Sequence, residues 1–258
     1  MDTYKETALT VWPLWRKIIF RFFFVYLFFQ LAPWGWLYGV PGISYITRYY
    51  DRLMDLAVNT ANAKLFHVKS VLVPMNGSGD TSYGWAQWWL WLSLGAIGCV
   101  VWSLLDRKRK NYIQLNYWLC VFGRYYLVFF AFIYGLIKIF TLQMPFPSIH
   151  QLATPLGDLL PMRFSWLFIG YSTPYQVFSG IMEVLAGLLL LNRRTATLGI
   201  LVATGVFINV MMLNLSYDIP VKIFSMQLVL VCLFLLANEA ERLYYFFILN
   251  LPCIYVFT

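Results

Sequence analysis

Long apolar blocks separated by short polar connections dominate the hydropathy pattern of this chain. About six of them approach or exceed the roughly 20 residues of helix that cross a bilayer: residues 16–38, 85–105, 114–140, 175–191, 195–215 and 221–237. A helix formed by each block would be apolar on all its faces, which is typical of helices that contact lipid or other helices. The pattern predicts an all-α fold, a polytopic transmembrane helical bundle of about six spans.

The polar stretch between the first two blocks, residues 39–84, contains a different kind of helix. Residues 45–66 hold no Pro or Gly. Apolar residues recur there at helical spacing and alternate with charged ones: Ile46, Tyr49, Leu53, Leu56 and Ala57 against Arg48, Asp51, Arg52 and Asp55. This pattern predicts an amphipathic helix lying on the outer membrane–water interface.

Composition supports this class and indicates an orientation. Hydrophobic residues make up 61% of the chain and charged residues only 12%, about half the charged share of a soluble domain. The net charge is +8, and basic residues cluster at Arg16 and Lys17, at 107–110, and at Arg193 and Arg194. With six spans these clusters share one side, which the positive-inside rule makes cytoplasmic.

We therefore expect an integral protein of the bacterial cytoplasmic (inner) membrane, with the N-terminus and the C-terminus both cytoplasmic. Its expected partners are membrane lipids, and no nucleic acid. The blocks suggest three parts: residues 1–112, an N-terminal two-span unit with the outer amphipathic segment; residues 113–237, with the other four spans; and residues 238–258, a C-terminal tail or partial further membrane element.

Ionisable side chains inside predicted spans are the first candidates for a site, because each costs roughly 2.5–3.5 kcal/mol near the middle of the membrane. Arg124 and Lys138 lie in the third span and Glu183 in the fourth. Counting along the two helices places Arg124 and Glu183 at similar depth, so we predict that they pair in the bundle centre. A structural pair that pins the helices and a ligand-binding pair are both open at this point.

A second group of polar residues completes the candidate ligand-binding set. Asn209 lies on a small-residue face of the fifth span, and Asp218 and Lys222 flank the turn between the fifth and sixth spans. A predicted polar mouth on the outer side consists of Lys138, Gln143, Asp158, Arg163, Asp218 and Lys222. The alternative is an ordinary interfacial loop with a snorkelling lysine.

Cofactor and catalytic motifs are sparse. The four cysteines, Cys99, Cys120, Cys232 and Cys253, form no C-x-x-C motif, and His67 and His150 both lie in predicted loops. No haem or metal site is expected from such residues. The sequence has no nucleotide-binding loop or nucleophile triad, so whether the protein is an enzyme stays open.

Two segments resemble a known membrane family. The third span reads RYYLVFFAFIYGLIK from Arg124 to Lys138, and the fourth reads FSGIMEVLAGLLLL from Phe178 to Leu191. An Arg followed by Gly and Lys, and then a Glu-x-x-x-Gly span, resembles the DoxX family, part of a wider superfamily that includes the membrane domain of vitamin-K-dependent carboxylase. The resemblance covers about half of the chain. This sequence departs from the family in its two additional N-terminal spans and its long outer segment.

The resemblance implies a DoxX-like four-helix core, with Arg124, Lys138 and Glu183 at the polar positions of the family. The member that gives the family its name is a small subunit of a thiosulfate:quinone oxidoreductase. The resemblance therefore implies a redox-associated accessory or subunit. It also implies a quinone or lipid pocket among the third, fourth and fifth spans, and a partner redox protein. Two other hypotheses stay open: a transporter or lipid-handling protein that uses the same charges, and a structural assembly partner of a larger membrane complex.

Overall fold

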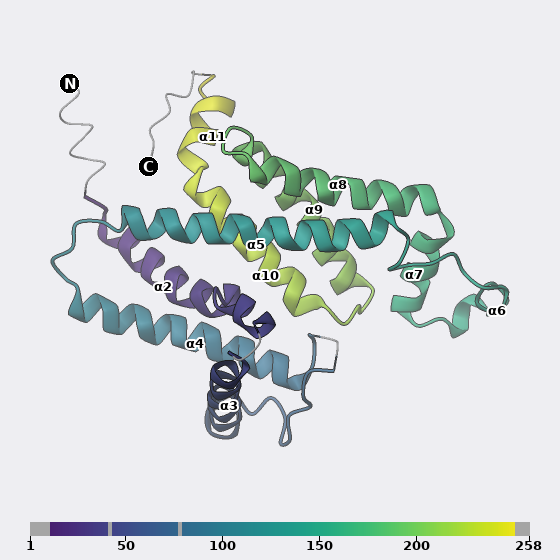
Figure 1. Cartoon of the computed structure of the whole chain (residues 1–258), viewed down its shortest axis with the longest axis horizontal. Helices are drawn as coiled ribbons and strands as arrows, with labels where there is room; N and C mark the ends of the chain where they lie inside the picture. Colours follow the sequence, from purple (N-terminus) through teal and green to yellow (C-terminus); the bar gives the residue numbers. More distant parts are fainter. Residues whose placement is uncertain (1–10, 41–42, 77–78, 251–258) are drawn as a thin grey trace. The chain divides into compact units, whose positions relative to one another are not determined.

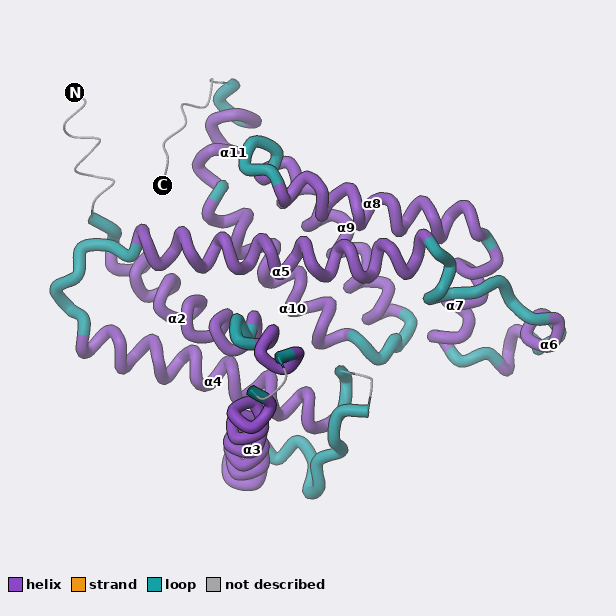
Figure 2. The backbone as a smooth tube through the Cα atoms, in the orientation of Figure 1, coloured by secondary structure: helices purple, strands orange, loops and turns teal. Residues whose placement is uncertain are grey.

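The computed structural model describes residues 11–40, 43–76 and 79–250. In these ranges the chain forms ten α-helices and no strand, which confirms the all-α prediction (Figure 2). Two compact units divide between Phe122 and Gly123, inside the long helix α5, Ile113–Ile139. The ends of the predicted first and third parts, residues 1–10 and 251–258, lie outside the described residues, and so does Cys253.

The first unit is built on an antiparallel pair of helices, α2 (Leu14–Leu31) and α4 (Ser82–Leu105), which lie side by side in Figure 1. Two glycines of α4 allow the close approach. A Cβ added at Gly95 would lie 3.2 Å from Tyr26, and one at Gly98 would lie 3.0 Å from Val25. The helix α2 is shorter than the predicted span 16–38, because Ala32 adopts a left-handed conformation and Pro33 follows it.

Arg21 of α2 forms hydrogen bonds at the C-terminal end of α4. The residue is 2% exposed, and its guanidinium donates hydrogen bonds to Ser103 Oγ and the Asp106 carbonyl, both at 2.8 Å, and to the Tyr112 hydroxyl. Burial raises the pKa of Tyr112 above its ordinary value, and the hydrogen bond from Arg21 opposes that rise. A buried charge whose donors are satisfied in this way stabilises the helix pair. It does not form a site.

The predicted amphipathic helix is present as α3, Ser44–Ala61, followed by a π-helical turn, Asn62–Phe66. One flank is buried, where Met54 and Val58 pack with Ala86 and Leu90 of α4. A second flank is apolar and exposed, and carries Tyr45, Ile46, Tyr49, Leu53 and Leu56. The Tyr38 and Tyr83 hydroxyls donate to Asp51 and Asp55 on the polar side, which fixes the rotation of the helix.

The second unit contains the C-terminal half of α5 and six further helices. These are α6 (Ile149–Leu152), α7 (Pro161–Tyr171), α8 (Thr173–Leu191), α9 (Ala196–Ser216), α10 (Lys222–Asn238) and α11 (Ala240–Phe247). Proline begins α7 and occupies the second position of α8, where its missing N–H would have no helical partner in any case. In sequence order α8, α9 and α10 pack as neighbours. The helices α6 and α7 lie in the segment between α5 and α8, where the sequence predicts no span.

Four helices of the described chain are long and apolar enough to cross a membrane: α4, α5, α8 and α9. A fifth span results if α10 and α11, which meet at a bend of 65°, are taken together. The helix α2 is outside this set because its 18 residues include Arg16, Lys17 and Arg21. The protein is thus an integral membrane helical protein with four to five candidate spans, fewer than the six predicted.

Two glycines set the distance between α5 and α8. A Cβ at Gly180 would lie 2.5 Å from the Gly135 carbonyl oxygen and 2.9 Å from the Ile139 backbone nitrogen. A Cβ at Gly135 would lie 2.8 Å from the Gly180 carbonyl oxygen. Because each neighbour is backbone, neither position can accept a side chain unless the helices separate.

We predict that Gly180→Ala destabilises the protein by about 1–3 kcal/mol, the usual range for overpacking a close contact. Gly205→Ala in α9 is the matched control, since no atom lies within 4 Å of its added Cβ, and alanine is the better helix former. Thermal unfolding of the purified protein in detergent compares the two. Equal unfolding midpoints would contradict the close α5–α8 contact.

Candidate functional site

A cavity of about 170 Å³ lies within the second unit, among α5, α7, α8, α9 and α10. Apolar residues make up most of its lining, and eight of them are aromatic: Tyr134, Phe164, Trp166, Phe168, Tyr175, Phe207, Tyr217 and Phe224. Eight polar side chains line the same space: Lys138, Gln143, Ser165, Ser179, Glu183, Asn209, Asn214 and Ser225. Apolar walls with a few polar groups are typical of small-molecule sites.

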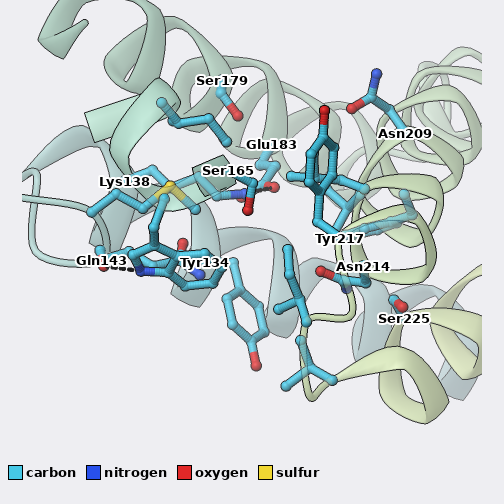
Figure 3. Close-up of a pocket in the computed structure, with 18 of the residues that line it drawn as sticks. Tyr134, Lys138, Gln143, Ser165, Ser179, Glu183, Asn209, Asn214, Tyr217 and Ser225 are labelled. Atoms are coloured by element: carbon cyan, nitrogen blue, oxygen red, sulfur yellow. Dashed lines mark hydrogen bonds and ion pairs between the residues drawn. The ribbon is translucent and has the colours of Figure 1, made fainter. Parts of the chain in front are cut away.

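The polar centre of the cavity is an ion pair between Lys138 of α5 and Glu183 of α8. Figure 3 shows the two side chains directed at each other from opposite helices. They are 7% and 1% exposed, and the Lys138 ammonium donates to Glu183 Oε1. The second carboxylate oxygen, Oε2, is buried and has no hydrogen-bond partner. The pair is therefore neutral overall but incompletely satisfied.

The predicted pairing of Arg124 with Glu183 is wrong. The guanidinium carbon of Arg124 lies 5.2 Å from the centroid of the Tyr125 ring, and the carboxylate of Glu183 belongs to Lys138. The close contact between Gly135 and Gly180 sets the register of the two helices. Arg124 precedes Gly135 by eleven positions, about 16 Å along the helix axis, so it cannot reach the level of Glu183.

A hydrogen-bonded connection closes one side of the cavity. The buried side-chain amide of Gln176 pairs with the backbone of Met144, with its nitrogen 2.6 Å from the carbonyl oxygen and its oxygen 3.2 Å from the amide nitrogen, in the amide orientation that satisfies both. Trp166 Nε1 donates to the Gln143 carbonyl at 3.2 Å. Together these contacts hold the segment after α5 against α7 and α8.

The remaining predicted site residues divide between the cavity and its surroundings. Asn209 is among the lining residues, although its side chain is largely exposed. Asp218 and Lys222 form an ion pair of 2.6 Å at the turn between α9 and α10, with the Asp218 side chain 80% exposed. Neither of these two residues belongs to the cavity lining.

Sequence reasoning missed Tyr134, Trp166 and Gln176. Two of these carried a usable signal, because residues spaced by three, four or seven positions share one face of a helix. Tyr134 precedes Lys138 by four positions, and Gln176 precedes Glu183 by seven. Trp166 lies between the predicted spans 114–140 and 175–191, and its helix α7 was not predicted.

Among the described residues, no group of three or more His, Cys, Asp or Glu side chains lies close enough to hold a metal ion. Cys99, Cys120 and Cys232 form no disulfide within the described part of the chain. The cavity offers aromatic side chains, an ammonium donor and a buried carboxylate oxygen that can accept one more hydrogen bond.

We predict that Lys138→Met destabilises the protein by about 3–5 kcal/mol, because it leaves the Glu183 charge buried and uncompensated. The double variant Lys138→Met/Glu183→Gln should recover most of this loss. Asp218→Asn breaks an exposed pair and should cost at most about 1 kcal/mol. Denaturant unfolding in detergent measures the free energy of unfolding of Lys138→Met, of Glu183→Gln and of the double variant. If the effects of the two single replacements simply add up in the double variant, direct pairing is contradicted.

Comparisons with known proteins give one relation. No protein-family model matches the chain. No solved structure matches it significantly. The uncharacterized protein YwoB of Bacillus subtilis (strain 168) is 36% identical over 121 residues, which are 46% of this chain and 75% of that protein. With that identity over three quarters of the relative, this chain belongs to the same family as YwoB.

Proposed function

We propose that this protein binds a lipid-soluble ring compound, a quinone, in the cavity among α5 and α7–α10. One observation carries the proposal: a buried ion pair, whose ammonium can donate further hydrogen bonds, lies at a cavity lined by eight aromatic residues. A quinone carbonyl accepts hydrogen bonds, and the ammonium of Lys138 is a donor at the polar centre. The aromatic walls supply stacking surfaces for the ring.

The exposed aromatic residues at the cavity suit a ligand that arrives from the bilayer. Phe168 and Tyr175 line the cavity and are 68% and 51% exposed, and their ring centroids lie 6.5 Å apart. In a membrane protein such side chains contact acyl chains. An isoprenoid tail could extend along them while the ring occupies the cavity.

The proposal includes a six-span arrangement, a DoxX-like core formed by α5 and α8–α10, and two additional N-terminal spans. The helix α2 would be the first span, since Arg16 and Lys17 lie near one end and Arg21 donates its hydrogen bonds within the protein. Both termini would be cytoplasmic, in the cytoplasmic (inner) membrane of a bacterium, and the relative YwoB is bacterial. The role would be that of a redox-associated accessory or subunit that works with a partner redox protein.

Cysteine labelling in intact cells tests the arrangement. We expect Asp80→Cys, in the segment before α4, to react with a membrane-impermeant maleimide. Lys108→Cys, between α4 and α5, should react only after the cells are opened, because the basic cluster 107–110 would be cytoplasmic. Both variants are made in a parent whose native cysteines are replaced, and the labelling of that parent gives the background. The reverse pattern would show the opposite orientation, and labelling of both positions in intact cells would reject a membrane crossing by α4.

Quinone binding is tested by titrating purified protein in lipid nanodiscs with decylubiquinone and following the quinone absorption spectrum. We expect saturable binding that weakens about tenfold or more in Glu183→Gln, because the ion pair that orients the Lys138 donor is lost. Glu241→Gln, the same replacement on an exposed residue of α11, should bind like the parent. If no saturable binding occurs, or if the two variants bind equally, the proposal fails.

A further inference from the structure

The unsatisfied oxygen of Glu183 indicates what the ligand must provide. Glu183 Oε2 is buried in a side chain that is 1% exposed, and the same residue lines the cavity. An ionised carboxylate only accepts hydrogen bonds. A buried polar group without a partner is unfavourable, so a ligand that brings a donor to this oxygen gains an interaction that a ligand without a donor does not.

The charge of the site further restricts which head groups can bind. Lys138 already neutralises Glu183 through the other oxygen. An anionic head group would face the free carboxylate oxygen, and a cationic one would compete with Lys138 for the same carboxylate. A neutral hydroxyl avoids both penalties and forms a charge-assisted hydrogen bond.

The dimensions of the cavity match a single ring. Its volume is about 170 Å³, close to that of a cavity of 150 Å³ that binds benzene in another protein. Tyr134, Phe207 and Phe224 are among the eight aromatic residues that line it. Aromatic side chains contact rings favourably through stacked or edge-on geometry.

We propose that the cavity selects a neutral ring bearing a hydroxyl group, whose O–H donates to Glu183 Oε2 while its apolar tail lies along Phe168 and Tyr175. This inference rests on the proposed function and deepens it, because only the reduced form of a quinone carries such a hydroxyl. The quinol, and not the quinone, is then the form that the site prefers. The selection involves binding alone, with no electron or proton transferred.

The direct test compares 4-heptylphenol with its methyl ether, 4-heptylanisole, which differ at the hydroxyl and are not redox-active quinones. Isothermal titration of the protein in lipid nanodiscs, with empty nanodiscs subtracted for partitioning, should give at least about tenfold tighter binding of the phenol. Glu183→Gln should reduce this preference to about twofold or less, because the amide nitrogen can donate to either oxygen. Glu241→Gln should keep the full preference.

A second comparison, of decylubiquinol with decylubiquinone under anaerobic conditions, links the result to the proposed function. We expect the quinol to bind more tightly, by a factor similar to that of the phenol. Thermal unfolding of each variant, and of Lys138→Met/Glu183→Gln as a neutral replacement of the pair, separates loss of binding from loss of fold.

Equal binding of phenol and anisole, or a preference unchanged in Glu183→Gln, would overturn the inference. If decylubiquinone binds without any preference for hydroxylated rings, the proposed quinone site stands and the donor selection fails. If the phenol preference is found but neither ubiquinone form binds, the donor selection stands and the quinone proposal fails.

Discussion

The buried ion pair between Lys138 and Glu183 is the constraint on which the second unit depends. Two ionised side chains in apolar surroundings are tolerated only while they remain together. Gly135 and Gly180 make this possible, since they let the backbones of α5 and α8 touch one turn from the charges. The contact between the helices and the chemistry of the cavity therefore have the same cause.

The two buried cations of the described chain, Arg21 and Lys138, illustrate two outcomes of this constraint. Arg21 donates to two hydroxyls and a carbonyl, so its hydrogen bonds stay within the first unit. Lys138 meets a carboxylate that keeps one oxygen without a partner. The first arrangement is complete and stabilises helices. The second retains binding capacity, and it lies beside a cavity instead of in a close-packed helix contact.

The amphipathic helix α3 and the short helix α11 have the residue pattern of helices that lie at a membrane boundary. Each carries charged and apolar residues on different sides, and each exposes aromatic side chains. Such helices lie favourably at the level of the lipid head groups. The position of α11 affects the number of spans. The chain bends by 65° after α10, so the 17 residues of α10 and the eight residues of α11 do not form one straight helix.

The sequence by itself determined the class of the protein. Runs of apolar residues must form helices in lipid, where the backbone has no other hydrogen-bond partners, and the charges at Lys138 and Glu183 were visible as exceptional within those runs. The partner of Glu183 was decided only by the tertiary structure. Depth counted along separate helices favoured Arg124, whereas the Gly135–Gly180 contact sets the register that brings Lys138 to the carboxylate. The cavity was likewise beyond the sequence, because α7 and the Gln176–Met144 contact form one wall through residues that no local pattern relates.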